Sequence, residues 1–149
     1  MRGPTLAVEV IEKMTSREGK ASGTFTITGW DEQPWAELEG APKLTHARVT
    51  TAYTGDLEAE GTSGLLMVYD GENASYGGYE RMVGSLDGRS GSFVLQVVGG
   101  FQDGAARTTW TVAEGTGTGD LAGLRGEGAY LAKQGDPEVA YELRWSLPD

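Results

Sequence analysis

The segment spanning residues 57–112 limits the folds open to this chain more than any other part. It contains four runs in which apolar and polar residues alternate, separated by short turns rich in Gly, Asp and Asn. Short runs with a period of two residues predict neighbouring antiparallel strands in a meander. Any pocket in the molecule must then be built from the faces of this meander. The predicted strands are Leu57–Asp70, Ser75–Leu86, Ser92–Phe101 and Arg107–Ala113.

Strand-like sequence continues on both sides of this segment. Alternation or a high content of β-branched residues predicts five further strands. We expect turns or loops at Thr15–Gly19 and at Asp31–Trp35, where Pro34 removes a backbone donor, and a glycine-rich connection at Gly115–Gly128. Within that connection, only Asp120–Leu124 could form a helical turn. The further strands are Thr5–Glu12, Ala21–Trp30, Lys43–Thr54, Ala129–Ala132 and Val139–Ser146.

These patterns together predict an all-β protein with little helix. A meander of this length must protect its edge strands, and closure into a barrel does so most completely. The length of 149 residues indicates a single domain over residues 1–149. We therefore expect one antiparallel β-barrel of eight to nine strands. A barrel of eight strands has room for packed side chains or for one small ligand.

Composition and charge exclude several classes of function. The chain has no Cys and one His, His46, so disulfides, thiolate chemistry and a His-rich metal site are excluded, and we expect no metal or cofactor. Lys and Arg number 12 against 22 Asp and Glu, a net charge of −10, which disfavours binding to nucleic acid. No apolar run is long enough to span a membrane, and the first residues lack the apolar core of a signal peptide. A cytoplasmic protein is the simplest interpretation.

Three polar residues within apolar runs are the candidates for a site. By period-two counting, Glu80 shares a face with Met82 and Leu86, Gln96 with Val94 and Val98, and Glu60 with Leu66 and Val68. If these faces line the barrel, two carboxyls and an amide point inward. Burial would raise the pKa of such a carboxyl and make it a usable general acid or base. Glu80 and Glu60 are thus the candidate catalytic residues.

Two further residues complete the predicted ligand-binding set of Glu60, Glu80, Gln96, Arg107 and Trp110. The hairpin turn at Asp87–Arg89 could place Glu80 beside Gln96. Arg107, on the next strand, is the natural cation for a buried carboxylate, and Trp110 is the expected aromatic neighbour. The competing interpretation is that Glu80 forms a structural ion pair with an arginine or lies on the outer surface. The arginines considered are Arg48, Arg81 and Arg107.

Two motifs suggest functions that their context does not support. Residues 117–122 match the pattern G-x-G-x-x-A of dinucleotide-binding loops, but Gly123, Gly126 and Gly128 interrupt the helix that should follow. Asn73-Ala74-Ser75 fits the glycosylation pattern, yet a plain turn is the simpler interpretation. His46 lies beside Arg48 in a Thr-rich strand and is interpreted as a surface or structural residue.

A set of short motifs resembles the bacterial family called domain of unknown function 3224. The resemblance covers most of residues 24–128. It implies a β-barrel similar to plant allene oxide cyclase and dirigent proteins, a superfamily that includes cofactor-free cyclases, and it carries no established activity or catalytic residue. The motifs are Trp30-Asp31-Glu32-Gln33-Pro34, Lys43-Leu44-Thr45, Thr54-Gly55-Asp56-Leu57-Glu58, Glu60-Gly61-Thr62, Gly78 with Glu80-Arg81, residues 88–96 and residues 117–128.

Three functions are compatible with these observations. The first is a barrel that binds a small apolar molecule in its cavity. The second is a cofactor-free cyclase or isomerase that acts on a hydrophobic substrate in the same cavity. The third is a filled barrel with a structural or interaction role. The resemblance also implies a homo-oligomer. The inward-facing residues distinguish these functions, because a carrier needs apolar walls and an enzyme needs a polar group within reach of its substrate.

Overall fold

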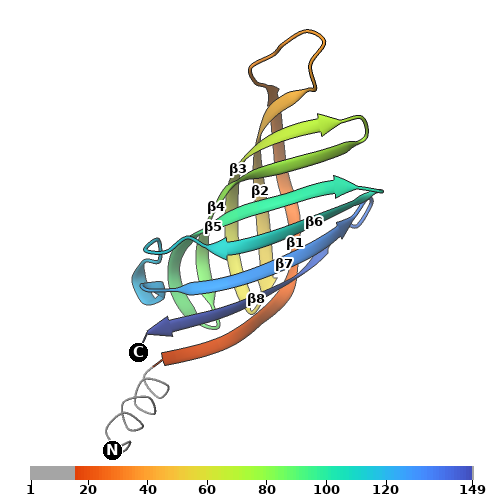
Figure 1. Cartoon of the computed structure of the whole chain (residues 1–149). Coiled ribbons are helices and arrows are strands. Elements are labelled where there is room, and N and C mark those ends of the chain that lie inside the picture. Colours follow the sequence, from red (N-terminus) through yellow and green to blue (C-terminus); the bar gives the residue numbers. More distant parts are fainter. Residues whose placement is uncertain (1–15, 149) are drawn as a thin grey trace, which may run out of the picture.

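The computed structural model describes residues 16–148, which form eight antiparallel strands closed into a barrel (Figure 1). Each strand pairs with the next along the chain, and the last pairs with the first. The predicted all-β barrel in meander order is therefore confirmed. The elements are β1 (Ser16–Pro34), β2 (Leu44–Gly55), β3 (Leu57–Asp70), β4 (Asn73–Leu86), β5 (Arg89–Gln102), β6 (Ala105–Val112), the short 3-10 helix η1 (Gly119–Leu121), β7 (Arg125–Lys133) and β8 (Val139–Pro148).

The long strand β1 closes the barrel. Its first part, from Ser16 to Phe25, pairs with β8, and its second part, from Gly23 to Pro34, pairs with β2. The pairing with β2 shifts by one residue between Ile27 and Gly29. A bulge of this kind bends a strand and increases its twist, which lets one strand serve both neighbours.

Some predicted boundaries are wrong, and pairing between strands explains the differences. The expected turn at Thr15–Gly19 is largely strand from Ser16 onward, because these residues pair with the end of β8. The expected loop at Asp31–Trp35 is strand as far as Pro34, which ends β1, a position where the missing donor is tolerated. The predicted strand Thr5–Glu12 lies outside the described residues. The predicted helical turn at Asp120–Leu124 is present as the shorter η1, which begins one residue earlier and ends at Leu121.

Side chains alternate between the inside and the outside of the barrel along every strand. On β2 and β3, the odd-numbered residues point inward, and on β4 and β6 the even-numbered residues do. The inward set is apolar and aromatic, as a barrel core requires. The core includes Phe25, Tyr53, Leu57, Met82, Leu86, Phe93, Leu95, Trp110, Leu121, Leu124, Tyr141, Leu143, Trp145 and Leu147.

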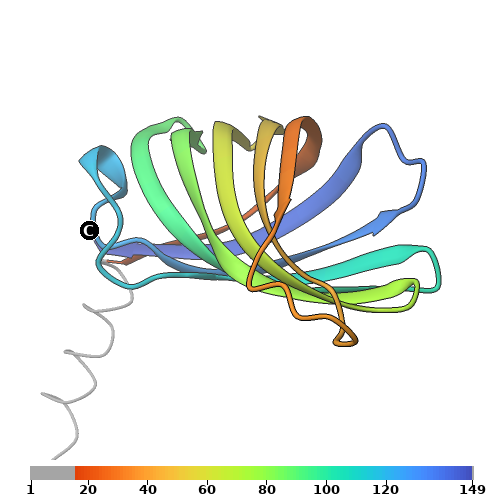
Figure 2. The same cartoon turned by 90° about the horizontal axis from the view of Figure 1, so that it is seen from above.

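The connection between β6 and β7 plugs one end of the barrel. The hydroxyl oxygens of Thr116 and Thr118 accept from the backbone N–H groups of Val94 and Ser92 on β5, and the N–H of Thr118 donates to the carbonyl of Ser92, which holds the connection against the barrel end. Leu121 and Leu124 are each 1% exposed and join the core there. Figure 2 places this connection at one end, with the β5–β6 turn and the β7–β8 loop at the other. A pocket inside the barrel lies in the opposite half.

Candidate functional site

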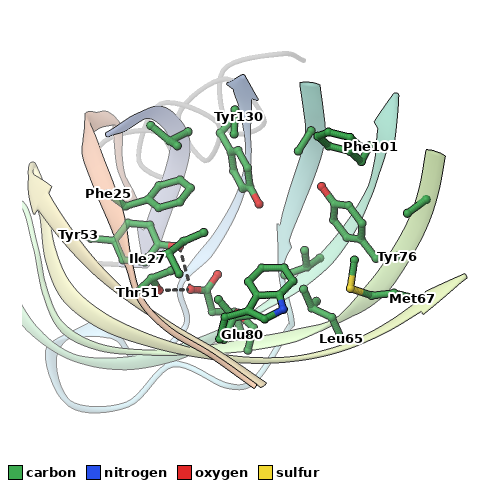
Figure 3. Close-up of a pocket in the computed structure, with 18 of the residues that line it drawn as sticks. Phe25, Ile27, Thr51, Tyr53, Leu65, Met67, Tyr76, Glu80, Phe101 and Tyr130 are labelled. Carbon is green, nitrogen blue, oxygen red and sulfur yellow. Dashed lines mark hydrogen bonds between the residues drawn. The ribbon is translucent and has the colours of Figure 1, made fainter. Parts of the chain in front are cut away.

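The unplugged half of the barrel contains a pocket with a volume of about 340 Å³ (Figure 3). This volume is at the lower end of the range of small-molecule sites. The walls come from all eight strands, and most of the lining is apolar or aromatic. The lining residues include Phe25, Ile27, Trp30, Val49, Thr51, Tyr53, Ser63, Leu65, Met67, Tyr69, Glu72, Ala74, Tyr76, Glu80, Val97, Phe101, Ala106, Tyr130, Ala132 and Val139.

A single buried carboxyl, Glu80, lies on the pocket wall. It lies on β4 and is 3% exposed. Because side chains alternate along the strand, Glu80 points to the same inner face as the core residues Met82 and Leu86. The hydroxyls of Thr51 and Tyr53 both donate to its Oε2 at 2.8 Å. No donor or cation from residues 16–148 reaches its Oε1. Figure 3 shows this second oxygen pointing away from Thr51 and toward the open middle of the pocket.

A glycine on the neighbouring strand makes room for this carboxyl. A Cβ placed on Gly61 would collide with Oε2 of Glu80 and would lie 2.5 Å from Oγ1 of Thr51. Gly61 does not have a positive φ, so its backbone conformation alone does not require glycine. Gly61 therefore supplies space rather than backbone freedom, and it fixes where the carboxyl can lie.

The surroundings of Glu80 alter its protonation. Burial raises the pKa of Glu80, and the hydrogen bonds from Thr51 and Tyr53 oppose this rise without cancelling it. Burial also raises the pKa of Tyr53 well above its usual value, and the negative charge of Glu80 adds to that rise. Tyr53 therefore stays protonated and acts as a hydrogen-bond donor to the carboxyl.

Aromatic rings surround the carboxyl side of the pocket. The ring of Phe25 lies 5.1 Å from that of Tyr53 and 4.9 Å from that of Tyr130, measured between centroids. On another wall, the hydroxyl of Tyr76 and that of Thr108 are hydrogen-bonded at 2.6 Å. Figure 3 shows the hydroxyls of Tyr76 and Tyr130 directed toward the interior. The pocket thus combines aromatic faces with a few hydroxyls and the buried carboxyl of Glu80.

A second carboxyl, Glu32, organises the pocket rim. It accepts hydrogen bonds from the hydroxyls of Thr45 and Tyr69 and, at 3.0 Å, from Nε1 of Trp30. Burial alone would raise the pKa of Glu32, but these hydrogen bonds and the charge of Lys43 lower it overall. Because Trp30 and Tyr69 line the pocket, this network holds two aromatic side chains in place at its rim.

The predicted orientation is confirmed for Glu80 and wrong for Glu60 and Gln96. The register places Ser63 and Leu95 opposite Glu80, whereas Glu60 lies opposite Val83 and Gln96 opposite Tyr79. Glu60 and Gln96 are exposed on the outer face of the barrel. The expected pairing of Glu80 with Gln96 in one layer therefore does not occur.

The expected partners of the carboxyl also differ from the prediction. Arg107 is exposed on the outer face of β6 and does not reach Glu80, and Arg48 and Arg81 are exposed too. Within residues 16–148, Glu80 has no ion pair, so the structural ion-pair interpretation is wrong. Trp110 is inside the barrel at 1% exposure, with its ring 6.0 Å from that of Tyr53, but it does not line the pocket.

Sequence reasoning missed the residues that hold the carboxyl. Thr51 and Tyr53 lie in a strand that was identified, and their odd numbering matches that of the apolar Ala47 and Val49. This shared alternation could have predicted that Thr51 and Tyr53 point into the barrel. Gly61 carried no signal by itself, because its role depends on the register between β3 and β4.

The described part of the chain offers neither a metal cluster nor a membrane-spanning helix. No group of three or more His, Cys, Asp and Glu side chains among residues 16–148 could hold a metal ion. In the same residues, no helix combines the length and the apolar character needed to cross a membrane.

The fold and the pocket define a small antiparallel barrel with a cavity in one half and a packed core in the other. The chain belongs to the family described as a protein of unknown function, DUF3224, whose model matches residues 21–145. It is similar to a crystal structure of a DUF3224 protein of unknown function from Shewanella oneidensis MR-1. The two share 28% identity and a TM-score of 0.73, over 87% of this chain and 97% of that one. No curated protein matches the chain.

Proposed function

We propose that this protein binds a small, mainly apolar molecule in the unplugged half of its barrel. The observation that carries the proposal is the pocket of about 340 Å³, with apolar and aromatic walls and one buried carboxyl that has a free oxygen. Sites of this composition are typical of small-molecule binding, since apolar walls supply affinity and a few polar groups fix orientation.

Small inward residues support this proposal over a filled barrel. Ala106 and Ala132 lie opposite each other on β6 and β7, and both line the pocket. A barrel packed solid would carry large side chains at such positions, as it does at Leu57, Leu95 and Leu143 in the other half.

A fluorescent titration tests the proposal. N-phenyl-naphthylamine is uncharged and apolar, and its emission increases when it leaves water for an apolar site. We expect saturable binding to the wild type and at least about tenfold weaker binding to Ala106→Trp, which fills the pocket. The control is Thr109→Trp, on the same strand but exposed on the outer face, which should bind like the wild type. Equal binding by both variants, or none by the wild type, would contradict the proposal.

Glu80 supports a second candidate function, a cofactor-free cyclase or isomerase. A buried carboxyl with a raised pKa and no cation within the described chain is suited to accept or donate a proton. Glu60, the other candidate acid or base, lies on the outer face and plays no part in this function. The wider resemblance to allene oxide cyclase stays a prediction.

The ring opening of nitrobenzisoxazole tests whether Glu80 acts as a base. A base removes the proton on carbon, the nitrogen–oxygen bond breaks, and a coloured cyanonitrophenolate is released. If Glu80 is catalytic, the wild type should react faster than acetate at the same concentration and pH, and Glu80→Gln should remove the difference. Equal rates for both proteins would reject the enzyme function and leave the binding function intact.

Two other expectations accompany the proposal. A homo-oligomer is supported by large apolar residues exposed on the outer faces of β3, β4 and β5, among them Leu66, Tyr79 and Val98. Light scattering at the monomer mass of 15.8 kDa would contradict it. A cytoplasmic location and the absence of nucleic-acid partners stay predictions from the sequence.

A further inference from the structure

Within the described chain, the charged side chains that line the pocket are all negative. The lining residues among 16–148 include Glu80 and Glu72 but no Lys, Arg or His. Glu80 lies deep in the pocket, and Glu72 is exposed in the β3–β4 turn at the rim. The whole chain adds a net charge of −10. The electrostatic potential inside the pocket therefore favours a positively charged group and opposes a negative one.

The carboxyl of Glu80 presents one of its two oxygens to such a group. The two hydroxyl donors, from Thr51 and Tyr53, both serve Oε2, and Oε1 faces the pocket with no donor from the described chain. A buried carboxylate without a cation is costly, and a cation that arrives with a ligand reduces that cost. Gly61 and the two hydroxyls hold the carboxyl in place, so a ligand does not have to order it.

The rings near Glu80 favour the same kind of group. Phe25 packs against Tyr53 and Tyr130 at centroid distances of 5.1 and 4.9 Å, and all three rings line the pocket. The face of an aromatic ring attracts a cation, and it does so more strongly where water is excluded. A carboxylate oxygen together with aromatic faces matches an alkylammonium group attached to an apolar body.

We infer that the ligand of this pocket is an apolar amine whose ammonium group pairs with Oε1 of Glu80 while its hydrocarbon part lies among the aromatic and aliphatic walls. This inference rests on the proposed function, because it requires that the pocket binds a small molecule. A carboxylic acid of the same shape would place a second negative charge beside Glu80 and is disfavoured. A neutral alcohol could donate one hydrogen bond to Oε1 but would leave the charge of Glu80 uncompensated.

The test compares three probes that share one apolar body. Phenylbutylamine, phenylbutanol and phenylvalerate each carry one group at the end of the same phenylbutyl chain, and that group is positive in the first, neutral in the second and negative in the third. Each is titrated against protein loaded with N-phenyl-naphthylamine near neutral pH. We expect the amine to displace the fluorescent probe at a concentration at least about tenfold lower than the alcohol, and the acid to be weakest.

A pair of variants locates the effect. Glu80→Gln keeps the shape and an acceptor for Thr51 and Tyr53, and it should remove most of the preference for the amine while changing the affinity for the alcohol less than about threefold. Glu60→Gln, exposed on the outer face of β3 and absent from the pocket lining, removes the same charge from the chain and should keep the preference. The ranking of probes on the wild type needs no variant, so the test holds even if Glu80→Gln folds poorly.

Each outcome decides one of the two proposals. If the alcohol or the acid displaces the fluorescent probe as well as the amine does, the amine inference is wrong and the binding function stands. The inference is also wrong if Glu80→Gln keeps the full preference for the amine. If the fluorescent probe does not bind the wild type at all, the binding function fails first.

Discussion

Substitution of Gly61 by Ala tests how the carboxyl is held. The added methyl would collide with Oε2 of Glu80 and lie 2.5 Å from Oγ1 of Thr51, so the carboxyl must move. Overpacking costs about 1–3 kcal/mol, and losing one hydrogen bond to a charged group costs about 1.5–3 kcal/mol. Replacing a glycine within a strand by alanine in itself stabilises the folded state by about 0.5–1 kcal/mol. The net loss should be about 1.5–5.5 kcal/mol, a fall in Tm of roughly 10 °C near the middle of that range.

Gly64 provides a matched control on the same strand. A Cβ there would meet only Nε2 of His46, at 3.6 Å, which is ordinary contact, so Gly64→Ala should be neutral or stabilising by about 0.5–1 kcal/mol. Urea unfolding followed by circular dichroism measures both changes.

A double-mutant cycle isolates the contact with the carboxyl. In a Glu80→Ala background the contact with the carboxyl is absent and only the contact with Oγ1 of Thr51 remains, so Gly61→Ala should cost clearly less than in the wild type, a coupling of about 1–3 kcal/mol with Glu80. Two results would refute the reasoning: Gly61→Ala as stable as Gly64→Ala, or the same loss with and without the carboxyl.

Three further predictions concern stability. Burial raises the pKa of Glu80, against the hydrogen bonds from Thr51 and Tyr53, so the folded protein keeps this proton to a higher pH than the unfolded chain does. The stability that the protonated carboxyl contributes is therefore fully present below its usual pKa of 4.5 and is lost as the pH rises through the raised pKa. Across that pH range, the free energy of unfolding of Glu80→Gln should rise relative to that of the wild type. A difference between the two proteins that stays constant with pH would contradict this prediction. Tyr141→Phe removes the hydroxyl that accepts from the Leu57 N–H at 3.1 Å and donates to the Thr54 carbonyl at 2.9 Å, and should cost about 1–3 kcal/mol in urea unfolding, so an unchanged midpoint would refute the role of this contact. Leu121→Ala opens the plugged end and should cost about 2–5 kcal/mol, whereas a loss below about 1 kcal/mol would show that η1 is not part of the core.

The barrel was predictable from sequence because its signals are local. Alternation and glycine turns identify the strands, and the need to protect edges favours closure. The length of β1 was not predictable in this way. Ser16–Gly19 and Asp31–Pro34 carry turn-like residues, and they become strand only because β8 and β2 lie beside them.

The site was half predictable, and the misplaced residues show why. On β5, the face of Gln96 carries Val94 and Val98, but the opposite face carries the larger Phe93 and Leu95. The larger apolar set is the one that packs inward, so comparing the two faces would have placed Gln96 outside. On β3, Leu66 and Val68 gave the face of Glu60 an apolar character although both lie on the outer surface. Because side chains alternate along a strand, assigning the inner face one residue out of step places every side chain of that strand on the wrong side of the sheet.

Methionine methyl NMR tests the central claim, that a small molecule binds in the unplugged half of the barrel. Met67 lines the pocket, while Met82 is fully buried and is not among the lining residues. In protein labelled with carbon-13 at the methionine methyls, titration with phenylbutylamine should shift the Met67 signal saturably and leave the Met82 signal in place. A Met67 signal that does not move at saturating probe, or a shift confined to Met82, would contradict the account.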